Sequence, residues 1–396
     1  MAIVPELGDM GKVVTVQNQN IPVAVRLLPL LGTALLLGGC SAQASNESHG
    51  DSVPPFRVTE VATFDQPWAM AFLPDGRLLV TEKEGALKIL EQDGKIRTIA
   101  GTPKVAYGGQ GGFGDVVLHP DFARNHLVYL SWAEAGDTRL RGAAVGRGRL
   151  DLDGPGGDRI DNLQVIWRQA PKMDSQVHYS HRLLFSPDGY LFISSGERAR
   201  GYPAQDMHGN LGKIVRLNDD GSVPADNPFS ALGGVSAQIW SLGHRNVLGL
   251  AFDAQGRLWE SEMGPRGGDE VNLIVRGHNY GWPLVSNGDD YDGTPIPDHP
   301  ARPEFDAPKV WWNPSISPAS LMIYSGSMFP QWRGSAFLGA LSGQALIRIE
   351  LDGESARKAD QWDMNARIRA VRQGPDGAIW LLEDGPDGRL LRLIPR

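Results

Sequence analysis

Three segments of the chain mix glycine with polar side chains, as binding and catalytic loops often do. The first, residues 108–115, places five glycines around Gln110. Without side chains, such a backbone can closely approach a flat or bulky ligand. The segment lacks the strand-to-helix setting of a dinucleotide-binding fingerprint. A plain flexible loop would explain it equally well.

The second segment, residues 178–183, holds two histidines, His178 and His181. An imidazole with a pKa near neutrality suits a general base, although a single histidine is more often structural. No third histidine, cysteine or carboxylate stands nearby at a ligand-like spacing, so we do not expect zinc here.

The third segment, residues 262–270, combines carboxylates with a glycine-rich backbone and is followed by residues 279–283. Carboxylate and carbonyl oxygens together suit Ca²⁺, which takes roughly six to eight oxygen ligands in flexible geometry. The alternative is a solvated acidic loop.

Arginines in apolar surroundings indicate an anionic ligand. Arg367 and Arg369 alternate around Ile368, so in a strand both guanidiniums face the same side. Arg245 follows an apolar run at residues 238–242. A guanidinium fork binds carboxylates in pairs. A solvent-facing charged strand is the alternative.

The elements that must position these residues are short β-strands. Six turns, of which Pro74-Asp75-Gly76 is typical, each precede a short run of β-forming residues. The turns recur about 45 to 77 residues apart. Such a period predicts an all-β fold, a six-bladed β-propeller of four-stranded antiparallel blades. A large β-sandwich or two all-β domains are the alternatives. No linker interrupts residues 56–396, so we expect one catalytic domain there.

The single cysteine, Cys40, excludes a disulfide within the chain. Arg26 and an apolar run at residues 27–37 precede Leu-Gly-Gly-Cys, which resembles a bacterial lipobox. We predict a signal peptide at residues 1–39, and a lipidated Cys40 with a flexible tether at residues 40–55. The start site stays open because residues 1–25 form a long leader. A buried apolar helix ending in a free thiol is the alternative.

These features predict an exported lipoprotein on the periplasmic side of the outer membrane, held to the membrane through Cys40. Ser41, rather than aspartate, after the cysteine favours the outer membrane. A soluble periplasmic protein is the alternative.

Composition excludes several classes of protein. The chain has 396 residues, 41% hydrophobic, with 49 glycines and 28 prolines, which argues against a helical bundle and against global disorder. Its formal net charge of −8 argues against a nucleic-acid partner, because phosphate binding needs a basic surface.

Taken in order, the motifs resemble the soluble glucose/sorbosone dehydrogenase family, and most closely its PQQ-dependent aldose sugar dehydrogenases. The resemblance covers nearly all of residues 56–396. It is carried by residues 67–70, 109–112, 178–183, 209–213, 239–246, 264–270, 279–283 and 367–369.

The resemblance implies a six-bladed propeller that binds pyrroloquinoline quinone (PQQ), a flat ortho-quinone with three carboxylates, together with Ca²⁺. It implies His178 as general base, oriented by Glu197, with Arg245 also in the catalytic site. The implied cofactor contacts are Gln110, Arg245, Asn246, Tyr291, Arg367 and Arg369. The carbonyls of Gly264 and Pro265 would hold the Ca²⁺ beside PQQ, and the Glu270 side chain and Tyr280 backbone a second, structural Ca²⁺.

The implied activity is oxidation of an aldose sugar at C1 to a lactone. Hydride would pass to PQQ, and electrons to an external quinone, cytochrome or dye. Two other functions stay open. A Ca²⁺-dependent sugar lactonase would need side-chain carboxylates converging on the central channel, and a non-catalytic binding propeller would bind no PQQ.

Two features depart from the family pattern. Ala340-Leu341 is followed by Ser342, where relatives carry a lysine that contacts the cofactor. Bulky Tyr179-Ser180-His181 follows His178 where small residues are usual, and we expect them to narrow the substrate pocket.

Overall fold

A computed structural model of the chain describes residues 53–396. The predicted signal peptide (1–39), Cys40 and tether residues 41–52 lie outside the described residues. The only helices within residues 53–396 are a four-residue α1 (Phe122–Asn125) and five short 3-10 turns. None of these is long and apolar enough to cross a membrane.

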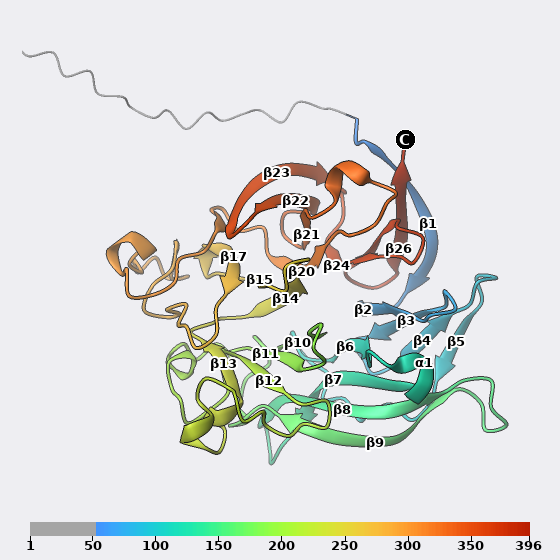
Figure 1. Cartoon of the computed structure of the whole chain (residues 1–396), viewed down its shortest axis with the longest axis horizontal. Helices are drawn as coiled ribbons and strands as arrows, with labels where there is room; N and C mark the ends of the chain where they lie inside the picture. The colour runs from blue at the N-terminus through green and yellow to red at the C-terminus, as the bar shows by residue number, and fades with distance from the viewer. Residues whose placement is uncertain (1–52) are drawn as a thin grey trace, which may run out of the picture. The chain divides into compact units, whose positions relative to one another are not determined.

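The strands form six four-stranded antiparallel sheets, or blades, arranged around a ring (Figure 1). Blade 1 consists of β2 (Pro67–Phe72), β3 (Leu78–Glu82), β4 (Leu87–Leu90) and β5 (Ile96–Ile99). Blade 2 consists of β6 (Phe113–Leu118), β7 (Leu127–Ala135), β8 (Arg141–Asp151) and β9 (Arg159–Arg168). Blade 3 consists of β10 (Ser180–Phe185), β11 (Leu191–Ser195), β12 (Lys213–Leu217) and β13 (Ile239–Leu242).

Blade 4 consists of β14 (Val247–Phe252), β15 (Leu258–Glu262), β17 (Asp269–Ile274) and β19 (Val310–Trp312). Blade 5 consists of β20 (Pro318–Ile323), β21 (Ala336–Ala340), β22 (Ala345–Asp352) and β23 (Ser355–Asp363). Blade 6 consists of β24 (Ile368–Gln373), β25 (Ile379–Glu383), β26 (Gly388–Pro395) and β1 (Phe56–Phe64). A small hairpin pairs β16 (Arg266–Gly267) with β18 (Gly288–Asp289).

The predicted six-bladed propeller is confirmed. The first strand of each blade lies nearest the centre of the ring, and β2, β6, β10, β14, β20 and β24 follow one another around it (Figure 1). The ring closes because β1, from the N-terminal side, pairs antiparallel with β26 and completes the last blade.

The six turn signals identified in the sequence all mark the same place in a blade, the hairpin between its first and second strands. The strands that follow are β3, β7, β11, β15, β21 and β25. In the first hairpin, Gly76 adopts a φ of +88° and donates its N–H to the carbonyl of Leu73. Glycine suits that position because left-handed backbone strains other residues.

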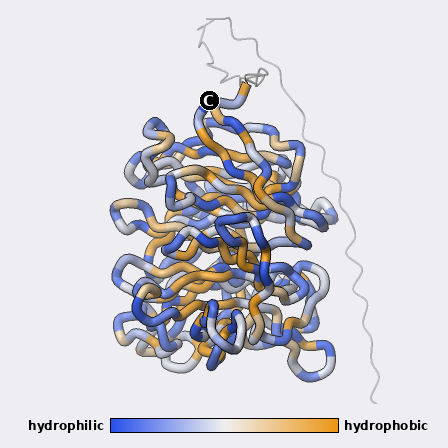
Figure 2. Tube along the Cα trace, turned by 90° about the vertical axis from the view of Figure 1, so that its right-hand side faces the viewer, coloured by the Kyte–Doolittle hydropathy of each residue, from blue (hydrophilic) through white to orange (hydrophobic). Residues whose placement is uncertain are grey.

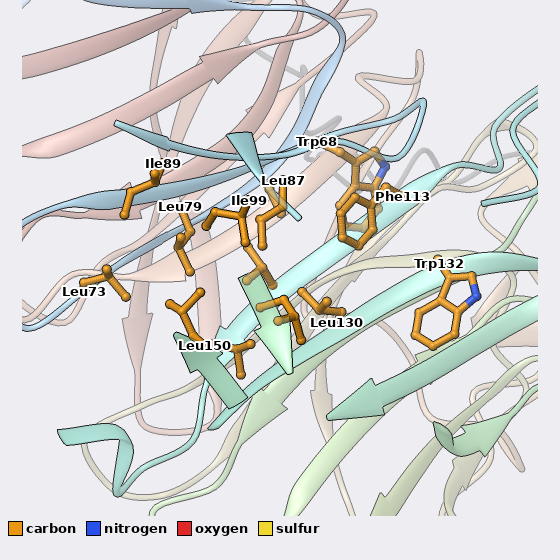
Figure 3. Packing of buried hydrophobic residues seen from close by; sticks show 14 of the residues in the cluster. Trp68, Leu73, Leu79, Leu87, Ile89, Ile99, Phe113, Leu130, Trp132 and Leu150 are labelled. Carbon is orange, nitrogen blue, oxygen red and sulfur yellow. The ribbon is translucent and has the colours of Figure 1, made fainter. Parts of the chain in front are cut away.

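The core lies between neighbouring blades. Figure 3 shows Trp68, Leu79, Leu87, Phe113 and Leu130 among the side chains that pack blade 1 against blade 2. Figure 2 shows the distribution of hydropathy along the chain: hydrophobic segments lie within the blades, and hydrophilic loops lie at the periphery. Each fully buried large apolar side chain contributes roughly 1.5–3 kcal/mol, so the packed blades form a rigid scaffold for the loops.

Arg182, on β10, is buried where the inner strands meet and contacts all five other blades, including the Arg369 carbonyl at 3.5 Å. Its guanidinium stacks on Trp68 at 3.9 Å and lies 3.6 Å from the Asp115 carboxylate. It also donates to the carbonyls of Leu248 and Ala319, each at 2.7 Å. Burial lowers the pKa of Arg182 to about 9, which leaves it charged at neutral pH.

Candidate active site

A cavity of about 400 Å³ opens where the loops leading into the inner strands converge. Most of its lining residues stand at the start of an inner strand or just after the second strand of a blade, so these segments meet on one face of the ring. All six blades contribute to its lining. Five of the residues predicted from the sequence line it: Gln110, Asn246, Tyr291, Arg367 and Arg369.

His178 lies beside this cavity and pairs with Glu197. Its Nδ1 is 2.5 Å from Oε1 of Glu197, whose side chain is buried. The other Glu197 oxygen accepts the backbone N–H groups of Arg200 and, at 2.6 Å, Gly201. Gly196 permits this approach, since a Cβ there would lie 2.0 Å from the His178 carbonyl oxygen.

The backbone of His178 is fixed as well as its ring. The residue adopts a φ of +50°, a sparsely populated conformation for a non-glycine residue that active sites often contain. Its N–H donates to Oε1 of Gln110 at 2.7 Å. Gln110 therefore positions His178 and keeps its own amide N–H groups available to a ligand.

The electrostatics keep this pair in the states that base catalysis needs. Burial lowers the pKa of His178; the Glu197 hydrogen bond opposes that change, while Arg245 and Arg198 reinforce it. Burial raises the pKa of Glu197, but His178 and the two backbone N–H groups outweigh it, so the pKa lies below its usual value. At neutral pH His178 is a neutral imidazole held by an ionised carboxylate.

Arg245 and Asn246 belong to the loop before β14. Arg245 donates to the carbonyl of Met263 and to the hydroxyl of Tyr291, both at 3.1 Å, while its buried Nε has no partner within the described residues. Oδ1 of Asn246 accepts from the backbone and hydroxyl of Ser180, at 3.2 and 3.1 Å. Arg245 thus links the His178 side of the cavity to Tyr291.

Arg367 and Arg369 face the cavity together, held by a carboxylate that the sequence motifs did not reveal. Asp384 accepts from Nε of Arg367 at 2.9 Å and from Nε of Arg369 at 2.8 Å. Burial raises the pKa of Asp384, but the two guanidiniums lower it below its usual value. The β24–β25 hairpin could have pointed to Asp384, since its register pairs Ile368 with Glu383 and so brings Asp384 beside Arg367.

The lining also includes Lys83, which was not predicted, and the three residues after His178, of which Tyr179 and His181 are bulky and Ser180 is small. Ser342, the position at which the resemblance implies a lysine, is exposed beside the cavity, with its hydroxyl 2.8 Å from that of Ser317. Within the cavity, three cationic side chains face one carboxylate.

A cluster of buried carboxylates lies in blade 4. The register places Glu262 opposite Glu270, and Glu260 opposite Asn272. Oxygens of Glu260 and Glu262 and a ring nitrogen of His244 lie within 4.8 Å of one another. Burial and mutual repulsion raise the pKa values of Glu260 and Glu270 well above normal.

This cluster has the donor set of a calcium site. Glu260 Oε2 and Asn272 Oδ1 are buried without a hydrogen-bond partner within residues 53–396. Such unpaired oxygens among crowded carboxylates fit the ligand chemistry of a hard divalent cation. The signal that we missed was the alternation of Glu260 with Glu262 and of Glu270 with Asn272, which puts all four on the same face of adjacent strands.

The predicted metal residues lie next to this cluster. Gly264, Glu270 and Tyr280 line one small cleft that also holds Arg245 and Glu262. Gly264 is fixed by its N–H, which donates to Asp269 at 2.9 Å. Pro265 is buried and lines neither this cleft nor the larger cavity, although Met263, two residues before it, lines both.

Comparison with known proteins assigns the chain to a family. The Glucose / Sorbosone dehydrogenase family profile matches residues 64–392, a range that contains every residue of the cavity and of the carboxylate cluster. The chain belongs to this family.

Relatives within the glucose/sorbosone dehydrogenase family share both sequence and fold. Aldose sugar dehydrogenase YliI of Escherichia coli (strain K12) is 41% identical over 341 residues, which cover 84% of this chain and 91% of that protein. The crystal structure of the soluble E. coli aldose sugar dehydrogenase in its apo-form has a TM-score of 0.81 at 38% identity, covering 86% of this chain and all of that one.

A PQQ-bound family structure is also similar. The PQQ-bound form of the aldose sugar dehydrogenase from Streptomyces coelicolor has a TM-score of 0.71 at 30% identity, and the match covers 87% of this chain and all of that one. The family likeness therefore extends over the whole described ring.

Proposed function

We propose that this protein is a PQQ- and Ca²⁺-dependent dehydrogenase that oxidises aldose sugars at C1 to lactones. The observation that carries the proposal is a cationic cavity beside a buried, neutral histidine held by an ionised glutamate. The family relatives support it, since one of their structures is described as PQQ-bound.

The cavity suits the quinone. Lys83, Arg367 and Arg369 outnumber the single carboxylate of Asp384, although the whole protein carries a net charge of −8. An acidic protein with a cationic cavity selects an anionic ligand there. Gln110, Asn246, Arg245 and Tyr291 would complete the contacts to PQQ, offering amide, guanidinium and hydroxyl groups that can bind its carboxylates and carbonyls.

Calcium has two places to bind beside it. The carbonyl of Gly264 would hold the ion nearest PQQ; Pro265, the second predicted ligand, lines neither the cleft nor the cavity, so its carbonyl is the weaker part of this proposal. The carboxylate cluster would take a structural ion, with Glu270 and the backbone of Tyr280 as predicted ligands and Glu260 and Glu262 as additional ones. When bound, PQQ supplies an ortho-quinone that accepts hydride, and Ca²⁺ supplies a Lewis acid.

The chain's own residues would manage the proton. Nε2 of His178 takes the proton of the C1 hydroxyl as the hydride leaves C1, so that C1–O becomes the carbonyl of the lactone. Glu197 keeps the remaining N–H on Nδ1 and stabilises the imidazolium that forms, as buried carboxylates do in catalytic triads. Arg245 adds positive charge beside the reacting groups.

The test is turnover by the purified protein with glucose and other aldoses, using dye reduction, before and after addition of PQQ and Ca²⁺. A visible spectrum of bound PQQ that bleaches on adding sugar would support the proposal. His178→Ala should abolish turnover and spare PQQ binding, while His208→Ala, at an exposed histidine, should change neither. Absence of PQQ binding and of turnover across a sugar panel would refute it.

The same assays separate the rival functions. A lactonase would hydrolyse sugar lactones without PQQ, and a binding module would do neither reaction. The carboxylate cluster lies on β15 and β17 rather than on the inner strand of blade 4. A lactonase would require carboxylates arranged around the central channel, and this cluster is not arranged in that way.

We also propose that the protein is exported and lipidated at Cys40 on the periplasmic side of the outer membrane. Electrons would leave to a quinone, cytochrome or artificial dye. Support comes from Arg26, the apolar run and the Leu-Gly-Gly-Cys sequence. Metabolic labelling with palmitate should mark the wild-type protein and not Cys40→Ser; equal labelling of the two would contradict lipidation at this residue.

A further inference from the structure

Lys83 follows β3 and is held firmly at the wall of the cavity. Its N–H donates to the carbonyl of Gln66 at 3.1 Å, and its carbonyl accepts from Phe113 at 2.8 Å. Gly112 packs against it so tightly that a Cβ there would lie 2.6 Å from the Lys83 carbonyl oxygen. The root of the side chain is therefore fixed between blades 1 and 2, and the side chain lines the cavity.

The ammonium of Lys83 has no ionic partner of its own. Within residues 53–396, no carboxylate oxygen lies within 4.0 Å of it, whereas Lys88 pairs with Glu82 at 3.6 Å and Lys172 with Glu134 at 2.6 Å. Its Nζ lies 5.8 Å from the ring centroid of Tyr107.

The surroundings of Lys83 penalise its charge. The side chain is half-buried, and burial together with the positive charges of Arg369 and Arg367 lowers the pKa of Lys83. Asp384 opposes this, but its oxygens already accept from both guanidiniums. An uncompensated ammonium next to two other cations loses free energy unless an anion occupies the cavity.

We infer that Lys83 binds a carboxylate of the quinone cofactor and so provides a cationic anchor in addition to Arg245, Arg367 and Arg369. This inference rests on the proposed function. The aldose substrate is neutral and gives a cluster of cations nothing to neutralise, whereas PQQ carries three carboxylates. Because Ser342 brings no charge to its side of the cavity, the anchor on blade 1 becomes more important for holding the cofactor.

The experiment is calorimetric titration of PQQ into the Ca²⁺-loaded apoprotein. A charge-assisted contact of this kind predicts that Lys83→Gln weakens PQQ binding roughly 10- to 100-fold. Lys83→Arg should recover most of the affinity, since it restores the charge. Lys88→Gln is the matched control, because Lys88 lies on the neighbouring strand and already pairs with Glu82; its affinity should equal that of the wild type.

The dependence on salt separates binding from a structural role. Loss of one ionic contact should make PQQ affinity less sensitive to added NaCl in Lys83→Gln than in the wild type. Equal affinity in Lys83→Gln and wild type would overturn the inference while leaving the proposed function intact. Affinity lost equally in Lys83→Gln and Lys83→Arg, with a lowered melting temperature, would also overturn it. Failure of the wild type to bind PQQ would overturn the proposed function and this inference together.

Discussion

Replacing Glu197 with glutamine tests the proposed base most directly, because it changes one charge and almost no volume. One Glu197 oxygen faces Nδ1 of His178 at 2.5 Å, and the other accepts the N–H groups of Arg200 and Gly201. Glutamine has only one acceptor oxygen. It can serve the two backbone donors only by turning its NH₂ group toward His178.

That orientation selects the wrong tautomer of the base. An NH₂ group donating to Nδ1 leaves the ring proton on Nε2, the atom that must accept the proton from the sugar. General base catalysis contributes roughly 10²- to 10⁴-fold, so we expect kcat of Glu197→Gln to fall by about that factor. PQQ affinity should stay within about twofold, since Glu197 does not line the cavity.

The assay is steady-state dye reduction with saturating PQQ and Ca²⁺, paired with calorimetry. In the wild type, the rate should decline as pH falls through the pKa of His178, below the usual value of about 6.5, because the base must be neutral. Asp206→Asn is the matched control, since it alters an exposed carboxylate 2.9 Å from His208. Undiminished kcat in Glu197→Gln would refute the assignment of His178 and Glu197.

Three further perturbations test other parts of the structure. Ser342→Lys should tighten PQQ binding in calorimetry by roughly tenfold, because it adds a cation beside the cavity; unchanged affinity would show that this position contributes nothing. Chelation by EGTA should lower the melting temperature of the wild type, and added Ca²⁺ should restore it. Glu260→Gln removes one of the crowded charges, so it should raise the melting temperature of the chelated protein and reduce the increase in melting temperature that Ca²⁺ brings. Burial lowers the pKa of His181 to about 3, so only the unfolded chain takes up a proton between about pH 6.5 and 3, and stability falls as pH falls. By pH 5 this group alone should cost about 2 kcal/mol, which urea denaturation should show as a smaller loss in His181→Asn than in the wild type.

Much of the fold could be read from the sequence because each blade repeats one local signal. The turn before the second strand needs a particular backbone conformation, and Gly76 and its counterparts reveal it without knowledge of the rest of the chain. What the turns could not reveal was the closure of the ring. The pairing of β1 with β26 joins residues from opposite ends of the described sequence, and no local rule encodes that partnership.

The residues of the site likewise fall into those that a local pattern predicts and those that only the assembled blades bring together. The alternation of Arg367 and Arg369 predicts a shared face, and both line the cavity. Asp384 and Lys83 lie outside any motif, and they reach the cavity only because the blades bring separate hairpins together. The carboxylate cluster could have been found by pairing Glu262 with Glu270 across adjacent strands, but that step requires the register.

Two similar dipeptides show why residue type alone could not assign these roles. His181-Arg182 and His244-Arg245 both stand near the start of an inner strand. β10 begins at Ser180, so Arg182 lies inside the sheet, where carbonyls from other blades accept from its Nε and Nη2. β14 begins at Val247, so Arg245 stays in the preceding loop with a buried Nε that has no partner in the described ring. The Arg182 guanidinium holds blades together through carbonyls and through the Asp115 carboxylate, 3.6 Å from its Nη1. Arg245 lies in a loop that lines the small cleft, where a ligand can reach it. The difference arises from where the strand begins relative to the arginine.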